Sequence, residues 1–138
     1  MSVRTPIAVA GLVLLLGVAL VPFAERPADP REVVLVVRQM AFHLGEDAAT
    51  PNPVIRVAPG ERIRITLVNM DAGVSHDLAI EAWGIHSPLL RGESRTSFLV
   101  RAPDEPGTAE YVCMPHASMM RGTIEVTAAA GDHRSSES

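Results

Sequence analysis

The stretch that decides the fold runs from Tyr111 to Gly122 and reads Tyr-Val-Cys-Met-Pro-His-Ala-Ser-Met-Met-Arg-Gly. It contains the only cysteine of the chain, a histidine and three methionines, and it stands just before a strand-like run. A second histidine, His76, lies upstream in a separate polar loop. One thiolate, two imidazoles and a weak thioether are the donor set of a mononuclear blue-copper electron-transfer site.

Outward from this stretch, short strand-like runs alternate with turn signals. The clearest run is Glu61–Asn69, in which Ile63, Ile65 and Leu67 are expected to point one way. The side chains of Arg62, Arg64 and Thr66 are expected to point the other way. Six further runs are expected to form strands: Glu32–Arg38, Val54–Val57, Asp77–Glu81, Ser94–Val100, Thr108–Cys113 and Thr123–Thr127. Seven or eight short strands with no long helical period predict an all-β antiparallel sandwich or barrel.

The N-terminal part has a different composition. No charged residue occurs from Thr5 to Ala24, and charged residues lie on both sides of this run. Such a run predicts an export segment, either a cleaved signal peptide or a retained anchor, and about 20 apolar residues suffice to span a bilayer. Phe23 and Pro22 stand where a cleavage site would have alanines, which favours retention. We therefore expect a segment at 1–24, a linker at 25–31, a folded domain at 32–127 and a disordered tail at 128–138.

Composition excludes some classes of function. A net charge of −4 argues against nucleic-acid binding, which normally requires a basic face. An exported domain with one cysteine has no internal disulfide framework. A thiol in an oxidising compartment is exposed to oxidation unless it is buried or bound to metal.

Each candidate ligand has an ordinary structural interpretation when taken alone. A buried cysteine usually acts as a small hydrophobe, and His116, Met119 or Met120 would alone indicate capping or packing. Together, at this spacing, they favour metal. Zinc also accepts histidine and cysteine, but a thioether is a poor zinc ligand and no fourth hard or thiolate ligand is evident, so copper is favoured.

The pattern Cys-x-x-His-x-x-x-Met-x-Gly-x-Ile-x-Val, from Cys113 to Val126, resembles the ligand loop of the cupredoxins, the blue copper proteins. The segment from Asn69 through Ser75-His76-Asp77 resembles the part of that family that carries its first histidine. The resemblance covers about residues 32–127. It implies a cupredoxin-like Greek-key β-sandwich of seven to eight strands.

Carried over to this sequence, the resemblance implies one type 1 copper per chain held by His76, Cys113, His116 and a methionine. If the family pattern is aligned on Gly122 and the last strand, Met120, directly before Arg121-Gly122, occupies the axial position. If the pattern is aligned on His116, Met119 is the alternative. Two residues depart from the family pattern. Asp77 replaces an asparagine that ties the two ligand loops together, and Met114 follows the cysteine in place of serine or threonine.

The other histidines have plain interpretations. His43 is expected to be a partly exposed loop residue, and His86 is expected to lie in a turn. Trp83 and Tyr111 are expected to pack in the core or at a sandwich edge.

Three classes of function follow from this donor set. The first is an exported one-electron carrier, in the periplasm or on the outer face of the cytoplasmic membrane, with redox partner proteins such as a cytochrome or a membrane oxidoreductase. It would act as a monomer and contact the membrane through an uncleaved N-terminal segment. The alternative is a periplasmic copper-binding protein for trafficking, storage or resistance, favoured by the extra methionines. The third class, an enzyme, is rejected because multicopper enzymes need further cysteines or histidines.

Overall fold

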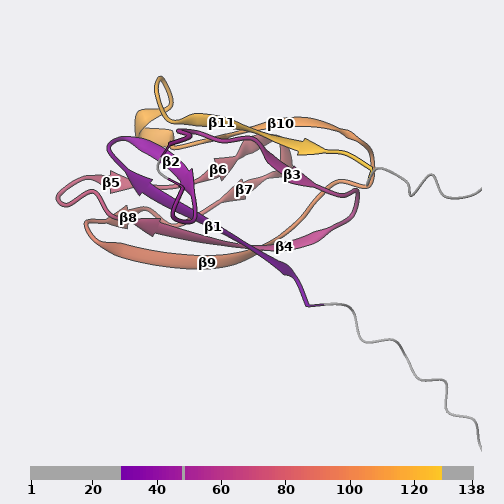
Figure 1. Cartoon of the computed structure of the whole chain (residues 1–138), viewed down its shortest axis with the longest axis horizontal. Helices are drawn as coiled ribbons and strands as arrows, with labels where there is room; N and C mark the ends of the chain where they lie inside the picture. The colour runs from indigo at the N-terminus through magenta and orange to yellow at the C-terminus, as the bar shows by residue number, and fades with distance from the viewer. Residues whose placement is uncertain (1–28, 48, 129–138) are drawn as a thin grey trace, which may run out of the picture.

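Two β-sheets packed face to face form the structure, a computed structural model that describes residues 29–47 and 49–128 (Figure 1). The first sheet has the order β2-β1-β4-β9, and its strands are β1 (Arg31–Arg38), β2 (Ala41–Leu44), β4 (Arg62–Asn69) and β9 (Ser94–Arg101). The chain crosses repeatedly between this sheet and the second one. The expected all-β Greek-key sandwich is confirmed.

The second sheet has the order β3-β11-β10-β6-β7. Its strands are β3 (Ile55–Val57), β6 (Ala79–Ile80), β7 (Ile85–His86), β10 (Gly107–Val112) and β11 (Arg121–Val126). A separate two-stranded ladder joins β5 (Ser75–His76) to β8 (Leu90–Arg91). Two short 3-10 helices, η1 (Glu81–Trp83) and η2 (Met114–His116), interrupt the strands.

The core follows from alternation along the strands. In β4 the side chains of Ile63, Ile65 and Leu67 are fully buried, and Arg62 and Arg64 are exposed, as the sequence pattern predicts. Phe42 and Tyr111 meet in the core with ring centroids 5.3 Å apart in an edge-on arrangement. Such alternation fixes the register, because a shift by one residue would expose every apolar side chain of the strand.

Strand pairing differs from the expectation in one respect. Seven strands have three or more residues, which agrees with the predicted number, and the other four are two-residue pieces. Most strand pairs are antiparallel, as expected, but β1 pairs with β4 and β3 pairs with β11 in parallel. Both parallel pairs join strands that are distant in the chain, and their direction depends on crossovers between the sheets that strand patterns do not encode.

The sandwich has two distinct ends. At the end that we call the site end, β4 terminates at Asn69, β10 terminates at Val112 and η2 follows (Figure 1). At the opposite end, the far end, β1 begins at Arg31 beside the start of β4, and β11 finishes at Val126. Both ends of the folded domain therefore leave from the far end.

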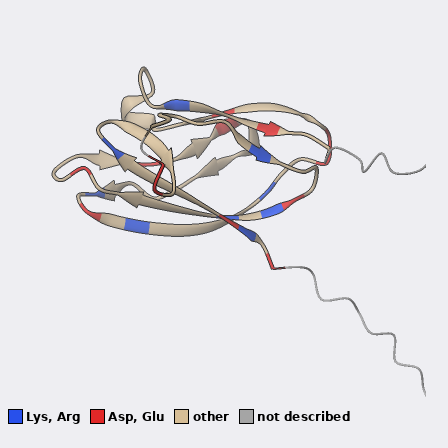
Figure 2. Cartoon of the chain, in the orientation of Figure 1, with Lys and Arg blue, Asp and Glu red and all other residues tan. Residues whose placement is uncertain are grey.

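Acidic and basic residues are interspersed along the described strands (Figure 2). Within the described residues, no helix is long and apolar enough to cross a membrane. The predicted export segment at 1–24, most of the linker at 25–31 and nearly all of the tail at 128–138 lie outside the described residues.

Candidate metal centre

Three of the predicted ligands converge at the site end. Cys113 Sγ lies 3.6 Å from His76 Nδ1 and 3.5 Å from His116 Nδ1. The donor atoms of all three residues lie within 4.8 Å of one another. The two imidazole rings have centroids 4.9 Å apart and are tilted by 53°. Two imidazole nitrogens and one thiol sulfur thus face a common point.

The loop after β10 supplies two of these donors. Cys113 directly follows the last residue of β10, and η2 then turns the chain so that His116 faces the cysteine. The N–H of Cys113 donates to the carbonyl of Met120 at 3.0 Å, and the N–H of Met120 donates to the carbonyl of His116 at 2.9 Å. These bonds close the loop before β11 starts at Arg121.

His76 arrives from the loop that follows β4. It lies on β5, opposite Leu90 of β8. Asn69, at the end of β4, is 1% exposed, and its side-chain amide donates to the carbonyl of Val74 at 2.8 Å. The amide therefore fixes the loop that carries His76, as a buried polar group should when it is fully paired.

Burial shifts the pKa values of two of the donors, Cys113 and His76. Cys113 and His76 are fully buried, whereas His116 is only half-buried. Burial raises the pKa of the Cys113 thiol, although backbone N–H groups of Asp77 and His116 act in the opposite direction. Burial and the neighbouring His116 lower the pKa of His76. A neutral imidazole and a thiol that loses its proton on metal binding are the forms such a site needs.

The two candidate axial methionines have opposite environments. Met120 is fully buried in the core cluster, whereas the side chain of Met119 is 56% exposed. Both residues precede β11, which begins at Arg121, and their side chains do not share one environment. Burial thus favours Met120, as the register of β11 predicts.

Asp77 joins the two ligand loops. Its Oδ1 accepts the backbone N–H of Met114 at 2.7 Å. The tie that the family pattern assigns to asparagine is therefore rebuilt with a carboxylate.

A second carboxylate near the site, that of Asp71, was not predicted from the sequence. Asp71 Oδ2 lies 3.2 Å from His76 Nε2, on the side of the ring that faces away from Cys113. Asp71 lies five residues before His76, in a turn-like segment that follows β4. A carboxylate shortly before a candidate ligand was the only available signal.

The remaining histidines and aromatic residues lie elsewhere. His43 lies in β2 and is only 5% exposed, so the prediction of a partly exposed loop residue is wrong. His86 is exposed in β7, not in a turn. Trp83 packs partly buried against the core, and Tyr111 is fully buried, as expected.

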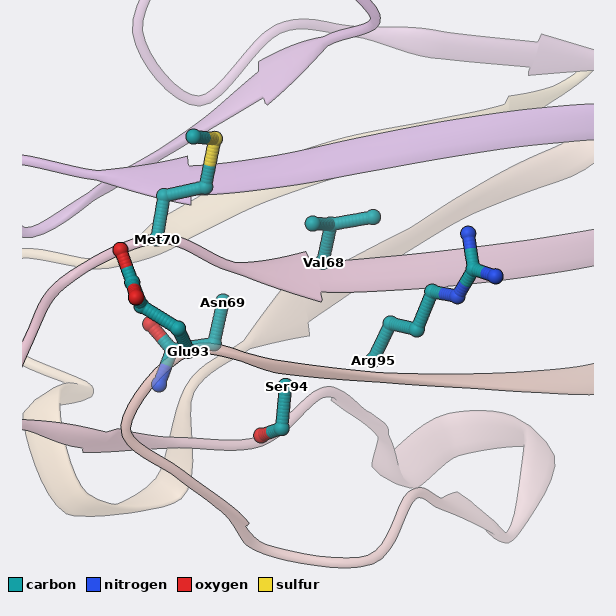
Figure 3. A pocket seen from close by; sticks show the side chains of 6 residues that line it. All are labelled: Val68, Asn69, Met70, Glu93, Ser94 and Arg95. Carbon is teal, nitrogen blue, oxygen red and sulfur yellow. The ribbon is translucent and has the colours of Figure 1, made fainter.

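Figure 3 shows a pocket beside the end of β4 and the start of β9, outside the ligand cluster. None of its lining residues is a predicted ligand, and the most exposed apolar one is Met70. Its lining residues are Val68, Asn69, Met70, Glu93, Ser94 and Arg95.

The donor set fits copper. A trigonal group of two histidines and one cysteine with a weak axial thioether is the type 1 copper arrangement. The cluster of His76, Cys113 and His116 contains no carboxylate. The thioether of Met120, directly before β11, is buried and is the candidate axial ligand. A single type 1 copper therefore fits these residues.

Comparisons with solved structures find similar chains in a terminal oxidase and in amicyanin mutants. A chain of a heme-copper terminal oxidase dimer is 18% identical, with a TM-score of 0.57, over 72% of this chain and 66% of that chain. A mutant of amicyanin in the Cu(I) form is 22% identical, with a TM-score of 0.49, over 70% of this chain and 82% of that chain. An oxidized amicyanin mutant is 25% identical, with a TM-score of 0.48, over 75% and 88% of the two chains.

No curated protein sequence matches this chain. The profile of the family described as copper binding proteins, plastocyanin/azurin family, matches residues 48–127. This range is more than half of the 138 residues and includes His76, Cys113, His116 and both candidate axial methionines. The chain belongs to the plastocyanin/azurin family of copper binding proteins.

Proposed function

We propose that this protein is an exported one-electron carrier that cycles a single type 1 copper between Cu(I) and Cu(II). His76, Cys113 and His116 bind the copper, and Met120 is the long axial ligand. The convergence of these three donors supports the assignment. A thiolate with two imidazoles suits both oxidation states, so the ion can change charge with little movement of its ligands.

His116 is the proposed route for electrons. Of the three clustered donors, His76 and Cys113 are fully buried, and only His116 is partly exposed. An electron that enters or leaves by the shortest path through the protein therefore crosses the His116 imidazole.

The surface around His116 suits brief encounters. Met114 and Met119 are 45% and 56% exposed, and Pro115 and Ser118 are also exposed. A small, largely apolar patch of this kind favours weak redox complexes, which typically bury less than about 1,200 Å². We propose a cytochrome or a membrane oxidoreductase as the redox partner, and a monomeric carrier.

The apolar run from Thr5 to Ala24 supports export. We propose that the folded domain acts in the periplasm or on the outer face of the cytoplasmic membrane, and that an uncleaved N-terminal segment holds it there. We propose no enzymatic activity for the isolated chain.

Spectroscopy of the full chain with Cu(II) tests the metal centre. We expect an intense thiolate-to-copper absorption band and the narrow EPR hyperfine splitting of a type 1 site. Both should disappear in Cys113→Ser. A colourless complex with Cu(II) would contradict the proposal.

A copper-trafficking role is the second candidate, and the exposed thioethers of Met114 and Met119 favour it. Soft thioethers prefer Cu(I), and near the surface they would help to hand the ion to another protein. Voltammetry separates the two functions. A carrier gives a reversible one-electron wave and retains copper in both states, whereas a trafficking protein binds Cu(I) and releases Cu(II).

A further inference from the structure

The carboxylate of Asp71 connects the first hairpin to the metal centre. Its Oδ1 accepts the backbone N–H of Gln39 at 2.7 Å, and its Oδ2 accepts the backbone N–H of Met40 at 3.0 Å. The same Oδ2 lies 3.2 Å from Nε2 of His76. Three N–H groups from two segments of the chain can therefore converge on one side chain.

The carboxylate is held in place from its own loop as well. The backbone N–H of Asp71 donates to Oδ1 of Asn69 at 3.0 Å, and its carbonyl accepts the N–H of Val74 at 3.2 Å. Burial raises the pKa of Asp71, but the N–H groups of Met40 and Gln39 outweigh this effect and hold it below the ordinary value of 3.8. Each carboxyl oxygen of Asp71 accepts a backbone N–H, an arrangement that stabilises the carboxylate form.

Only one neutral tautomer of His76 can both bind metal and pair with Asp71. Nδ1 faces the thiol of Cys113, and Nε2 faces a carboxylate that has no proton to donate. The proton must then reside on Nε2, which leaves the lone pair of Nδ1 free to bind metal. The ring is fully buried, so no solvent competes with the carboxylate for Nε2.

We propose that Asp71 is a positioning residue of the metal centre, which fixes the tautomer and orientation of His76 and stabilises oxidised copper through its negative charge. The proposal rests on the copper-binding function proposed above. Outer groups of this kind typically change metal affinity by about 10- to 100-fold.

A competing interpretation is that Asp71 only stabilises the turn between β1 and β2. Gln39 and Met40 have φ of 51° and 60°, in the left-handed region that non-glycine residues rarely adopt. Two-residue hairpin turns of this type prefer Asn-Gly. The double substitution Gln39→Asn/Met40→Gly therefore supplies a turn that needs no help from the carboxylate, and it is the matched background for the test.

The first measurement needs no copper. Nitrogen-15 NMR of the imidazoles in the metal-free full chain should show His76 protonated at Nε2. Asp71→Asn should keep this tautomer, because one side-chain oxygen remains, whereas Asp71→Ala should give a mixture of tautomers. Wild-type protein with His76 protonated at Nδ1 would overturn the proposal even if copper binds normally.

The second measurement is the ratio of the Cu(II) and Cu(I) dissociation constants. Asp71→Asn should shift this ratio towards Cu(I) by about tenfold, which is about 59 mV for one electron. The shift should persist in the Gln39→Asn/Met40→Gly background. If the ratio does not shift, or if the shift disappears in this background, Asp71 only stabilises the turn between β1 and β2. Failure of the wild-type protein to form a thiolate–copper band would instead overturn the proposed function and leave the NMR result valid.

Discussion

The ring of Tyr111 occupies the space where a side chain of Gly122 would lie. The two residues are paired across β10 and β11, and a Cβ built on Gly122 would come within 2.2 Å of Cζ of Tyr111. The Tyr111 hydroxyl also donates to the carbonyl of Pro53 at 2.5 Å, so the ring has little freedom to move aside. The glycine of the ligand-loop pattern is therefore required by packing.

Gly122→Ala should lower the free energy of unfolding by about 1–3 kcal/mol, the usual cost of overpacking a well-filled core. Chemical denaturation of the metal-free protein measures this. Gly107→Ala is the matched control, because Gly107 lies in the same β10–β11 pair and a Cβ there meets nothing within 4 Å. Equal stabilities of the two variants would contradict the packing argument.

Met120→Leu should change the copper spectrum, and Met119→Leu should not. Leucine preserves volume, so the buried site should tolerate it at a cost under about 1.5 kcal/mol. Loss of the axial thioether should raise the reduction potential and alter the EPR parameters, since the axial ligand tunes both. The opposite pattern, with an effect only at the exposed Met119, would assign the axial position to that residue.

Asp77→Ala should weaken copper binding by about tenfold, because Met114 then loses the acceptor of its backbone N–H and the two ligand loops separate more easily. Asp77→Asn retains an acceptor oxygen and should keep most of the affinity. Competition with a Cu(I) chelator measures both variants. If Asp77→Ala binds copper as tightly as the wild-type protein, the tie between the loops has no role in affinity.

Glu61 should make the protein sensitive to acid. Hydrogen bonding from Arg31 lowers the pKa of Glu61 below its ordinary value of 4.5, although partial burial acts in the opposite direction. The folded state thus binds fewer protons than the unfolded state in this range, so the stabilisation is complete above about pH 4.5 and is lost as pH falls through the folded pKa.

Urea denaturation between pH 3 and pH 7 measures this effect. Glu61→Gln should be less stable than the wild-type protein at neutral pH, and the difference should shrink at acid pH. Arg31→Gln should reproduce the change, because Arg31 Nε donates to Glu61 at 2.7 Å. A difference between Glu61→Gln and the wild-type protein that does not vary with pH would contradict the assignment.

Local patterns predicted much of the structure. The alternation in β4 predicted its buried face, and the spacing from Cys113 to His116 predicted a tight loop that brings their side chains together. Both inferences needed only residues close in the chain, where geometry follows directly from spacing.

Features that depend on distant partners could not be predicted in this way. β2 has only four residues, and its turn is made by Gln39 and Met40 in place of a recognisable Asn-Gly pair. Asp71 contacts that turn across more than 30 residues of sequence, so local patterns do not indicate its role. The role is apparent only in the folded structure, where the β1–β2 hairpin and the His76 loop lie together. The parallel pairings of β1 with β4 and β3 with β11 have the same origin.

The arrangement of the two ends of the sandwich has a practical consequence. β1 begins and β11 finishes at the far end, while His116 lies at the site end. A fusion partner, an affinity tag or a linker to a gold electrode joined at Arg31 or Val126 would therefore leave the His116 edge unobstructed. Immobilised in that orientation, the domain would present its redox edge to the solution.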